Sequence, residues 1–265
     1  MLFAGVDIGS TTSKCVLLDE QGEERAFARI MTEFNRDVSG EKVLKEALAA
    51  ANATEADIAY LVSTGYGRKA FHRSDKDIPE IIAHALGTDR VAPGVRTIID
   101  IGGQDSKVIA MNEHGGVDRF EMNDKCAAGT GRFFEVLTHR LLGIEMDELS
   151  DLVMQAEKPV SISSTCTIFA ESEIISLLSQ GTAPADIAAG VGYSIARRII
   201  AQGKAGRIPY AEPIVFSGGV ANNQGITDIF SVLLGKPVTR LAVPQATAAL
   251  GAACKAKAEY ESLHK

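Results

Sequence analysis

The chain has 265 residues, of which 46% are hydrophobic and 23% charged, and its formal net charge is −7. This composition excludes a disordered or fibrous protein, and the length suits one large domain or two of ordinary size. The acidic balance and the scattered basic residues argue against nucleic acid as a partner. We see no secretion signal and no apolar run of about 18 residues that would span a membrane. We therefore expect a cytoplasmic α/β enzyme.

The chain contains an internal repeat. Val6–Leu17 aligns without a gap with Ile99–Ala110, and Asp, Ile, Gly, Ser and Lys coincide in the two copies. In each copy an apolar run reaches an aspartate, turns at glycine, passes through small polar residues and becomes apolar again, which is typical of a β-hairpin. The repeat predicts two related domains, one comprising residues 1–94 with a returning C-terminal helix at 245–265, and the other residues 95–244.

After each hairpin, periodicity predicts further elements in chain order. In the first domain these are a strand at Glu24–Ile30, a helix at Glu41–Ala51 introduced by Ser39 and Gly40, a strand at Ile58–Ser63 and a helix at Ile78–Leu86. In the second domain the expected strands are Thr97–Ile101, Ser106–Met111, Val117–Met122 and Pro213–Phe216. The expected helices there are Arg132–Leu142, Asp147–Gln155, Ile168–Ser179, Ala185–Gln202 and Gln224–Leu234, and a final helix covers Gln245–Tyr260.

The two hairpin turns can bind phosphate, because glycine admits close approach of backbone N–H groups and small hydroxyls add donors. The expected phosphate-binding residues are Gly9, Ser10, Thr11, Thr12, Ser13 and Lys14 in the first turn, and Gly102, Gly103, Gln104 and Asp105 in the second. Asp7 and Asp100 would face each other across a cleft and bind hydrated Mg²⁺ through water. The Gln104 amide would orient the attacking water, because phosphoanhydride hydrolysis depends chiefly on positioning.

A third motif, Phe216–Ala221, is an apolar strand that opens into paired glycines, where a purine or its ribose can lie on the backbone. The other expected cofactor-binding residues are Gly218, Gly219, Val220 and Gln245. The chain has neither a P-loop nor the GxGxxG pattern of a Rossmann fold. In their order, DIGST, DIGGQ and SGGVA resemble the motifs of the acetate and sugar kinase, heat-shock chaperone and actin superfamily.

This resemblance implies an α/β fold of two related actin-like (ribonuclease-H-like) domains, with a nucleotide cleft between them that binds ATP or ADP. Ala248–Ala253 looks like the second hinge helix of that superfamily.

Two of the four cysteines, Cys126 and Cys166, immediately precede predicted helix starts, where the helix dipole and free N–H groups favour a thiolate. One chain offers only these two ligands, so a four-cysteine cluster requires a symmetric dimer. Cys15 falls in a predicted strand and Cys254 in the terminal helix, and we interpret both as core residues.

The segments around these cysteines resemble the activator, or archerase, component of 2-hydroxyacyl-CoA dehydratases. Relatives of that component include the ATPase subunits of benzoyl-CoA reductases and the reductase of double-cubane cluster proteins. The motifs that carry the resemblance are TGYGR at Thr64–Arg68, DIGGQDSK at Asp100–Lys107, MNDKCAAGTGRF at Met122–Phe133 and SSTCTIFAESE at Ser163–Glu173.

The resemblance implies a homodimer in which Cys126 and Cys166 of each subunit ligate one shared [4Fe–4S] cluster. It also implies that a reduced ferredoxin or flavodoxin loads the cluster, and that ATP binding or hydrolysis changes the mutual angle of the two cysteine-bearing helices. One electron then passes to an iron–sulfur enzyme of the dehydratase or reductase type.

Two other functions use the same nucleotide motifs. A small-molecule kinase of the superfamily would transfer the γ-phosphate to a substrate, but it leaves the two cysteines unexplained and needs insertions for which 265 residues leave little room. A chaperone-like or filament-forming ATPase would need a peptide-binding extension or polymer contacts. The segment Thr64–Arg68 is either a structural turn or a contact to the cleft or the partner.

Overall fold

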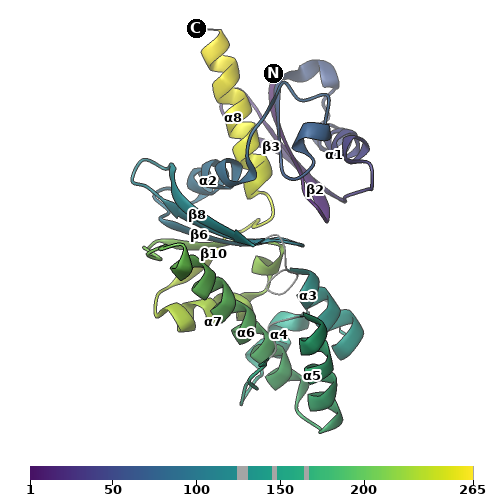
Figure 1. Cartoon of the computed structure of the whole chain (residues 1–265). Helices are drawn as coiled ribbons and strands as arrows, with labels where there is room; N and C mark the ends of the chain where they lie inside the picture. Colours follow the sequence, from purple (N-terminus) through teal and green to yellow (C-terminus); the bar gives the residue numbers. More distant parts are fainter. Residues whose placement is uncertain (124–130, 145–147, 164–166, 265) are drawn as a thin grey trace. The chain divides into compact units, whose positions relative to one another are not determined.

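The computed structural model describes residues 1–123, 131–144, 148–163 and 167–264. The chain divides into two compact units, which can be followed by colour in Figure 1. Unit 1 consists of Met1–Gly94, Met111–Val117 and Gln245–Lys265, and unit 2 consists of Val95–Ala110 and Asp118–Pro244. Each unit has its own sheet and its own hydrophobic core.

The two sheets have the same strand order, β3-β2-β1-β4-β5 in unit 1 and β8-β7-β6-β9-β10 in unit 2. In unit 1 the strands are β1 (Leu2–Ile8), β2 (Thr12–Leu18), β3 (Glu24–Met31), β4 (Ile58–Thr64) and β5 (Lys76–Asp77). In unit 2 they are β6 (Thr97–Ile101), β7 (Ser106–Met111), β8 (Val117–Asn123), β9 (Ile214–Gly218) and β10 (Val238–Arg240). The first two strands of each unit are antiparallel, and the fourth runs parallel to the first. The internal repeat therefore corresponds to two mixed sheets of one topology.

Helices connect and cover these strands. They are α1 (Arg36–Ala50), α2 (Glu80–Val91), α3 (Gly131–Glu135), a π-helix η3 (Val136–Leu142), α4 (Glu148–Met154), α5 (Thr167–Ser179), α6 (Pro184–Ala205), α7 (Gln224–Leu234) and α8 (Thr247–Leu263). Short 3₁₀ turns lie at η1 (Glu55–Asp57), η2 (Arg68–Ala70) and η4 (Gly219–Asn222). Within the described ranges, no helix is long and apolar enough to cross a membrane.

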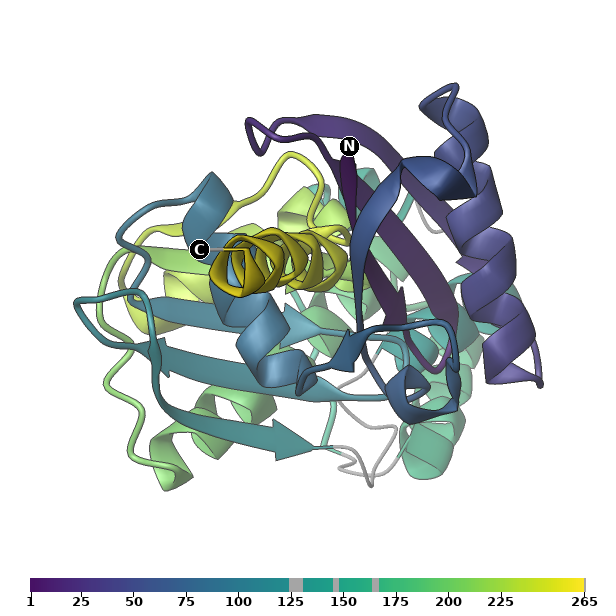
Figure 2. The same cartoon turned by 90° about the horizontal axis from the view of Figure 1, so that it is seen from above.

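Every side chain of the central strand β1 is buried, and because side chains alternate along a strand, they enter the cores on both faces of the sheet. On β1, Val6 and Ile8 belong to the cluster that includes residues of α1, whereas Phe3 belongs to the cluster that includes residues of α8. Figure 2 shows α8 almost end-on, with α2 beside it and α1 on the other side of the sheet. The sheet of unit 1 is thus a layer between α1 and the pair α2 and α8.

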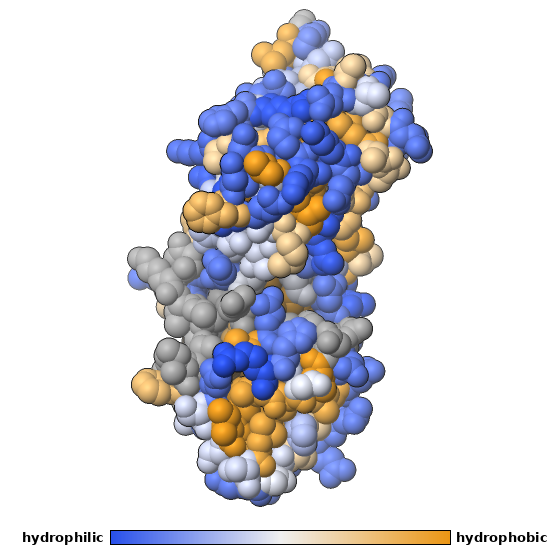
Figure 3. Space-filling view, turned by 90° about the vertical axis from the view of Figure 1, so that its right-hand side faces the viewer, coloured by the Kyte–Doolittle hydropathy of each residue, from blue (hydrophilic) through white to orange (hydrophobic). Residues whose placement is uncertain are grey.

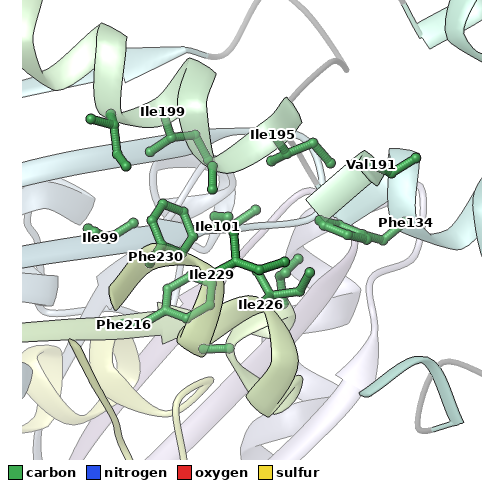
Figure 4. Close-up of a cluster of buried hydrophobic side chains, with 14 of the residues drawn as sticks. Ile99, Ile101, Phe134, Val191, Ile195, Ile199, Phe216, Ile226, Ile229 and Phe230 are labelled. Carbon is green, nitrogen blue, oxygen red and sulfur yellow. The ribbon is translucent and has the colours of Figure 1, made fainter. Parts of the chain in front are cut away.

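The core of unit 2 lies between its sheet and the helices α6 and α7 (Figure 4). Ile99 and Phe216 extend from neighbouring parallel strands, and the rings of Phe216 and Phe230 are 5.1 Å apart and tilted by 58°. Tilted aromatic pairs of this geometry add to the free energy gained from burial alone. The side chains of β6 and β9, the strands that end at the second hairpin and at the paired glycines, are therefore buried in this core.

The strands β6 and β7 and the helix α7 have the bounds that the sequence predicts, and other elements differ. The helix α1 begins at Arg36, because the Asn35 side chain accepts hydrogen bonds from the backbone N–H groups of Asp37 and Val38. Ser39 and Gly40, expected before the helix, are buried inside it. The short strands β5 and β10 were not predicted, since two or three residues carry no readable alternation.

The crossing of α2 and α8 predicts a measurable effect of one methyl group. A Cβ on Gly251 would lie 1.8 Å from the backbone oxygen of Ala83. Gly251→Ala should lower the free energy of unfolding by about 1–3 kcal/mol through overpacking, although alanine favours an isolated helix by about 1 kcal/mol. Chemical denaturation measures the difference.

Ser262→Ala is the control, because Ser262 is exposed on the same helix. A Gly251→Ala protein at least as stable as the Ser262→Ala protein would show that the two helices can separate at no cost.

Candidate nucleotide and metal site

The first hairpin turn joins β1 to β2 and is closed by backbone contacts. The N–H of Gly9 donates to the carbonyl oxygen of Thr12 at 3.2 Å, and the N–H of Thr32 donates to the carbonyl oxygen of Thr11 at 2.9 Å. Ser13 is fully buried, and its hydroxyl lies 2.9 Å from that of Thr32. The Ser13 side chain thus connects the turn to Thr32, which follows β3. Ser10, Thr11 and Thr12 are half-buried.

Asp7 lies at the end of β1 and is 3% exposed. Its cross-strand partner is Lys14, whose Nζ donates to Asp7 Oδ2 at 3.0 Å. The other oxygen, Oδ1, is buried and has no hydrogen-bond partner among the described residues. A buried carboxylate oxygen without a donor is costly, and a divalent cation or its water ligand would satisfy it. Asp7 therefore fits the expected Mg²⁺ site.

The segment Thr64–Arg68 packs directly on this aspartate. Thr64 is the parallel cross-strand neighbour of Asp7, and the N–H of Gly67 donates to the carbonyl oxygen of Ile8 at 2.9 Å. A Cβ on Gly65 would lie 2.4 Å from Asp7 Oδ1. The segment therefore forms one wall around the Asp7 carboxylate.

The second hairpin contains the same aspartate–lysine pair as the first, and here both residues are buried. Asp100 and Lys107 are cross-strand partners, each 1% exposed, and the Lys107 Nζ lies 3.3 Å from Asp100 Oδ2 and 2.7 Å from Asp105 Oδ2. The Ser217 hydroxyl donates to Asp100 Oδ1 at 2.8 Å. Both oxygens of Asp100 thus already accept a hydrogen bond, and Asp7 offers the better oxygen for a cation. Gln104 is exposed on the turn.

The paired glycines lie beside this second turn. Gly218 is the parallel partner of Ile101, and a Cβ on Gly218 would lie 2.3 Å from the Ile101 carbonyl oxygen. Its φ of 86° is in the left-handed region, so the position favours glycine for two reasons. Gly219 is half-buried, and the Val220 side chain is buried in the core. Within unit 2, the structure therefore brings together Gly102–Asp105 and Gly218–Val220.

Gln245 precedes α8 and belongs to unit 1. Its amide oxygen accepts a hydrogen bond from the Arg29 guanidinium. Arg29 is the cross-strand partner of Lys14, which in turn is the partner of Asp7. Asp7, Lys14 and Arg29 therefore form one row across three strands, on the face of the sheet that α8 covers.

Cys126 and Cys166, the expected cluster ligands, lie outside the described residues. Cys15 is buried in β2, and burial raises the pKa of its thiol well above the ordinary range. Cys254 is half-buried against the core of unit 1, and burial also raises the pKa of its thiol. Both cysteines thus pack in the core of unit 1, as the sequence predicts.

Three contributing residues were not predicted from the sequence, namely Lys107, Ser217 and Arg29. Lys107 could have been found, because it aligns with Lys14 in the internal repeat and lies opposite an aspartate in any tight hairpin of this length. Ser217 and Arg29 act through neighbouring strands that are distant in sequence, so no local signal marks them.

Two sheets of one mixed topology, each with an Asp-Ile-Gly hairpin, define an α/β fold of the actin-like ATPase class. A glucokinase of the ROK family from Streptomyces griseus, solved with glucose and AMPPNP, has a TM-score of 0.59 at 15% identity, with 97% of this chain and 100% of that chain covered. At this identity the likeness shows the fold alone.

The sequence profile of the BadF/BadG/BcrA/BcrD ATPase family matches residues 4–256, and the chain belongs to this family. It is 43% identical over 265 residues to the activator of lactoyl-CoA dehydratase from Anaerotignum propionicum, with 100% of both proteins covered. The activator of 2-hydroxyisocaproyl-CoA dehydratase from Clostridium difficile, solved with bound ADPNP, has a TM-score of 0.94 at 40% identity, and 100% of this chain and 97% of that chain are covered. The kinase interpretation is not favoured, because the kinase shares only the fold.

The buried pair of Asp100 and Lys107 predicts a strong dependence of stability on the lysine. Lys107→Met leaves two buried carboxylates, Asp100 and Asp105, without their shared ammonium group. The free energy of unfolding should fall by about 3–5 kcal/mol, the usual cost of breaking a buried ion pair. Denaturation in urea measures it.

Lys76→Met serves as the control, because Lys76 pairs with Glu259 at the surface and should leave stability nearly unchanged. Equal effects of the two substitutions would contradict the special role of the buried pair.

Proposed function

We propose that this protein is an ATP-dependent activator that delivers low-potential electrons to a partner iron–sulfur enzyme. The observation that carries the proposal is the 43% identity to the activator of lactoyl-CoA dehydratase along the whole length of both chains. The acceptor would be a 2-hydroxyacyl-CoA dehydratase, or an enzyme related to benzoyl-CoA reductase or to double-cubane cluster proteins.

The nucleotide chemistry belongs to the two hairpins and the paired glycines. The first turn, with Lys14, and the second turn, Gly102–Asp105, bind the phosphates, and Gly218–Val220 with Gln245 bind the adenosine part. Asp7 and Asp100 hold Mg²⁺ through water, and the orphaned Asp7 Oδ1 supports this assignment. When bound, Mg²⁺ neutralises phosphate charge. Gln104, exposed on its turn, orients the water that converts ATP to ADP and phosphate.

The cluster proposal is supported by the donor set. Each chain carries the thiols of Cys126 and Cys166, so two chains supply the four that a [4Fe–4S] cluster takes. When bound, the cluster accepts one electron from a reduced ferredoxin or flavodoxin and releases the same electron to the acceptor.

Hydrophobic surface on unit 2 is consistent with the homodimer. Figure 3 shows hydrophobic residues gathered on the face of unit 2 that is turned to the viewer. The helix α5, which begins at Thr167, exposes Phe169 by 68% and Ile175 by 52%. Contiguous exposed hydrophobic surface of this kind marks interaction sites in soluble proteins.

Anaerobic purification with counts of iron and sulfide tests the redox function. We expect four irons and four sulfides per dimer, as for one [4Fe–4S] cluster, and loss of both in Cys126→Ser. Because a cluster held between subunits is exposed on one side, its absorbance should also bleach in air.

Cys15→Ser is the matched control, since Cys15 is buried in a strand and should leave the iron content unchanged. A colourless wild-type protein with no iron, which still hydrolyses ATP, would refute the electron-transfer function and leave the ATPase.

A further inference from the structure

We propose that Gly65 is a positioning residue for the Asp7 carboxylate, and that the segment Thr64–Arg68 thereby sets how strongly the bound nucleotide depends on Mg²⁺. The inference rests on the proposed nucleotide function, in which Asp7 is a ligand of the metal through water. It gives a role to the motif TGYGR, which the nucleotide-binding assignments leave unused.

The Asp7 carboxylate is enclosed from two sides within unit 1. On the β2 side, the Lys14 ammonium holds Oδ2 at 3.0 Å. On the β4 side, Thr64 is the cross-strand neighbour of Asp7, and Gly65 directly follows it against Oδ1. The first contact is an ion pair that attracts one oxygen, and the second is a steric wall that limits where the other oxygen can lie.

The wall requires glycine for a steric reason. An ideal Cβ on Gly65 would lie 2.4 Å from Asp7 Oδ1 and 2.7 Å from the Ile8 carbonyl oxygen, both far inside contact distance. The φ of Gly65 is 84°, which side-chain-bearing residues rarely adopt. Of the two atoms, the carboxylate oxygen is the one that can move, because the Ile8 carbonyl is held by the sheet and by the N–H of Gly67.

The segment is anchored so that the wall cannot simply recede. The Arg68 guanidinium donates to the Gly65 carbonyl oxygen at 3.0 Å and pairs with Asp77 of β5 at 3.4 Å. The Thr64 hydroxyl donates to the carbonyl oxygen of Ile78 at 3.0 Å. A Cβ on Gly67 would lie 2.3 Å from Ile8 Cγ2, so this glycine lets the turn lie on the end of β1.

A side chain at position 65 would change the position of the Asp7 carboxylate and not its charge. A methyl group at position 65 pushes the carboxylate away from its observed place, while Asp7 keeps its charge and Lys14 its ion pair. Misplacement of a functional group by about 1 Å can cost 10²-fold in a reaction that depends on alignment. For a contact made through water, we expect a smaller loss, on the order of tenfold in the Mg²⁺ requirement.

The test is calorimetric binding of ADP to the full chain at increasing Mg²⁺ and in EDTA. Gly65→Ala should raise the Mg²⁺ concentration for half-maximal enhancement of ADP binding about tenfold and leave ADP affinity in EDTA unchanged. Gly94→Ala is the matched control, because Gly94 has a φ of 80° and no atom within 4 Å of its Cβ position, so it carries the same backbone strain without the contact.

A second variant covers the possibility that Gly65→Ala does not fold. Arg68→Met removes the brace from the Gly65 carbonyl and should shift the Mg²⁺ requirement in the same direction by a few-fold. Arg73→Met is its control, since the Arg68 and Arg73 side chains are both 30% exposed and Arg73 pairs with Glu41 and Glu55 instead.

The outcomes separate the two proposals. In the Asp7→Ala background, adding Gly65→Ala should leave ADP binding unchanged at every Mg²⁺ concentration, because the glycine acts only through that carboxylate. If the wild-type protein needs Mg²⁺ and loses that need in Asp7→Ala, but Gly65→Ala behaves as Gly94→Ala does, the positioning role is wrong and the proposed metal site stands. If ADP binding to the wild-type protein is indifferent to Mg²⁺, both are wrong.

Discussion

The structure depends on one repeated interaction, an aspartate at the end of a central strand paired with a lysine directly opposite it on the next strand. Asp7 with Lys14 and Asp100 with Lys107 occupy the same register position in the two hairpins. A carboxylate buried beside a sheet must be paired or hydrogen-bonded, because an isolated charge in the interior is far too costly. Each pair therefore holds a buried carboxylate next to a turn rich in glycine and small polar residues.

The two copies of this pair differ in how completely the aspartate is hydrogen-bonded. Lys107 is buried and shared by Asp100 and Asp105, and the Ser217 hydroxyl donates to Asp100, so both oxygens of Asp100 accept a hydrogen bond. The first pair leaves Asp7 Oδ1 without a hydrogen bond in the described part of the chain. The same sequence motif thus has both carboxylate oxygens hydrogen-bonded in unit 2, whereas in unit 1 one carboxylate oxygen has no hydrogen bond from the described residues.

Glycine lets backbones and carboxylates meet at the points where this arrangement needs close approach. Gly218 lies against Ile101, Gly65 lies against Asp7, and Gly251 lets α8 cross α2. Because strands and packed helices carry these contacts, the side chains of the site are positioned by rigid elements, which is the condition under which small displacements matter.

The sequence by itself determined the repeat, the two hairpins and most central elements, because these follow from local periodicity and turn chemistry. It also predicts that Asp7 and the glycine motifs belong to a nucleotide site, and this remains a prediction. Only the tertiary structure decided that the Ser217 hydroxyl donates to Asp100, that Gly65 lies against the Asp7 carboxylate, and that β5 and β10 extend the sheets. These features arise from parallel pairing between strands that are remote in the chain, and such pairing leaves no periodic trace in either strand alone.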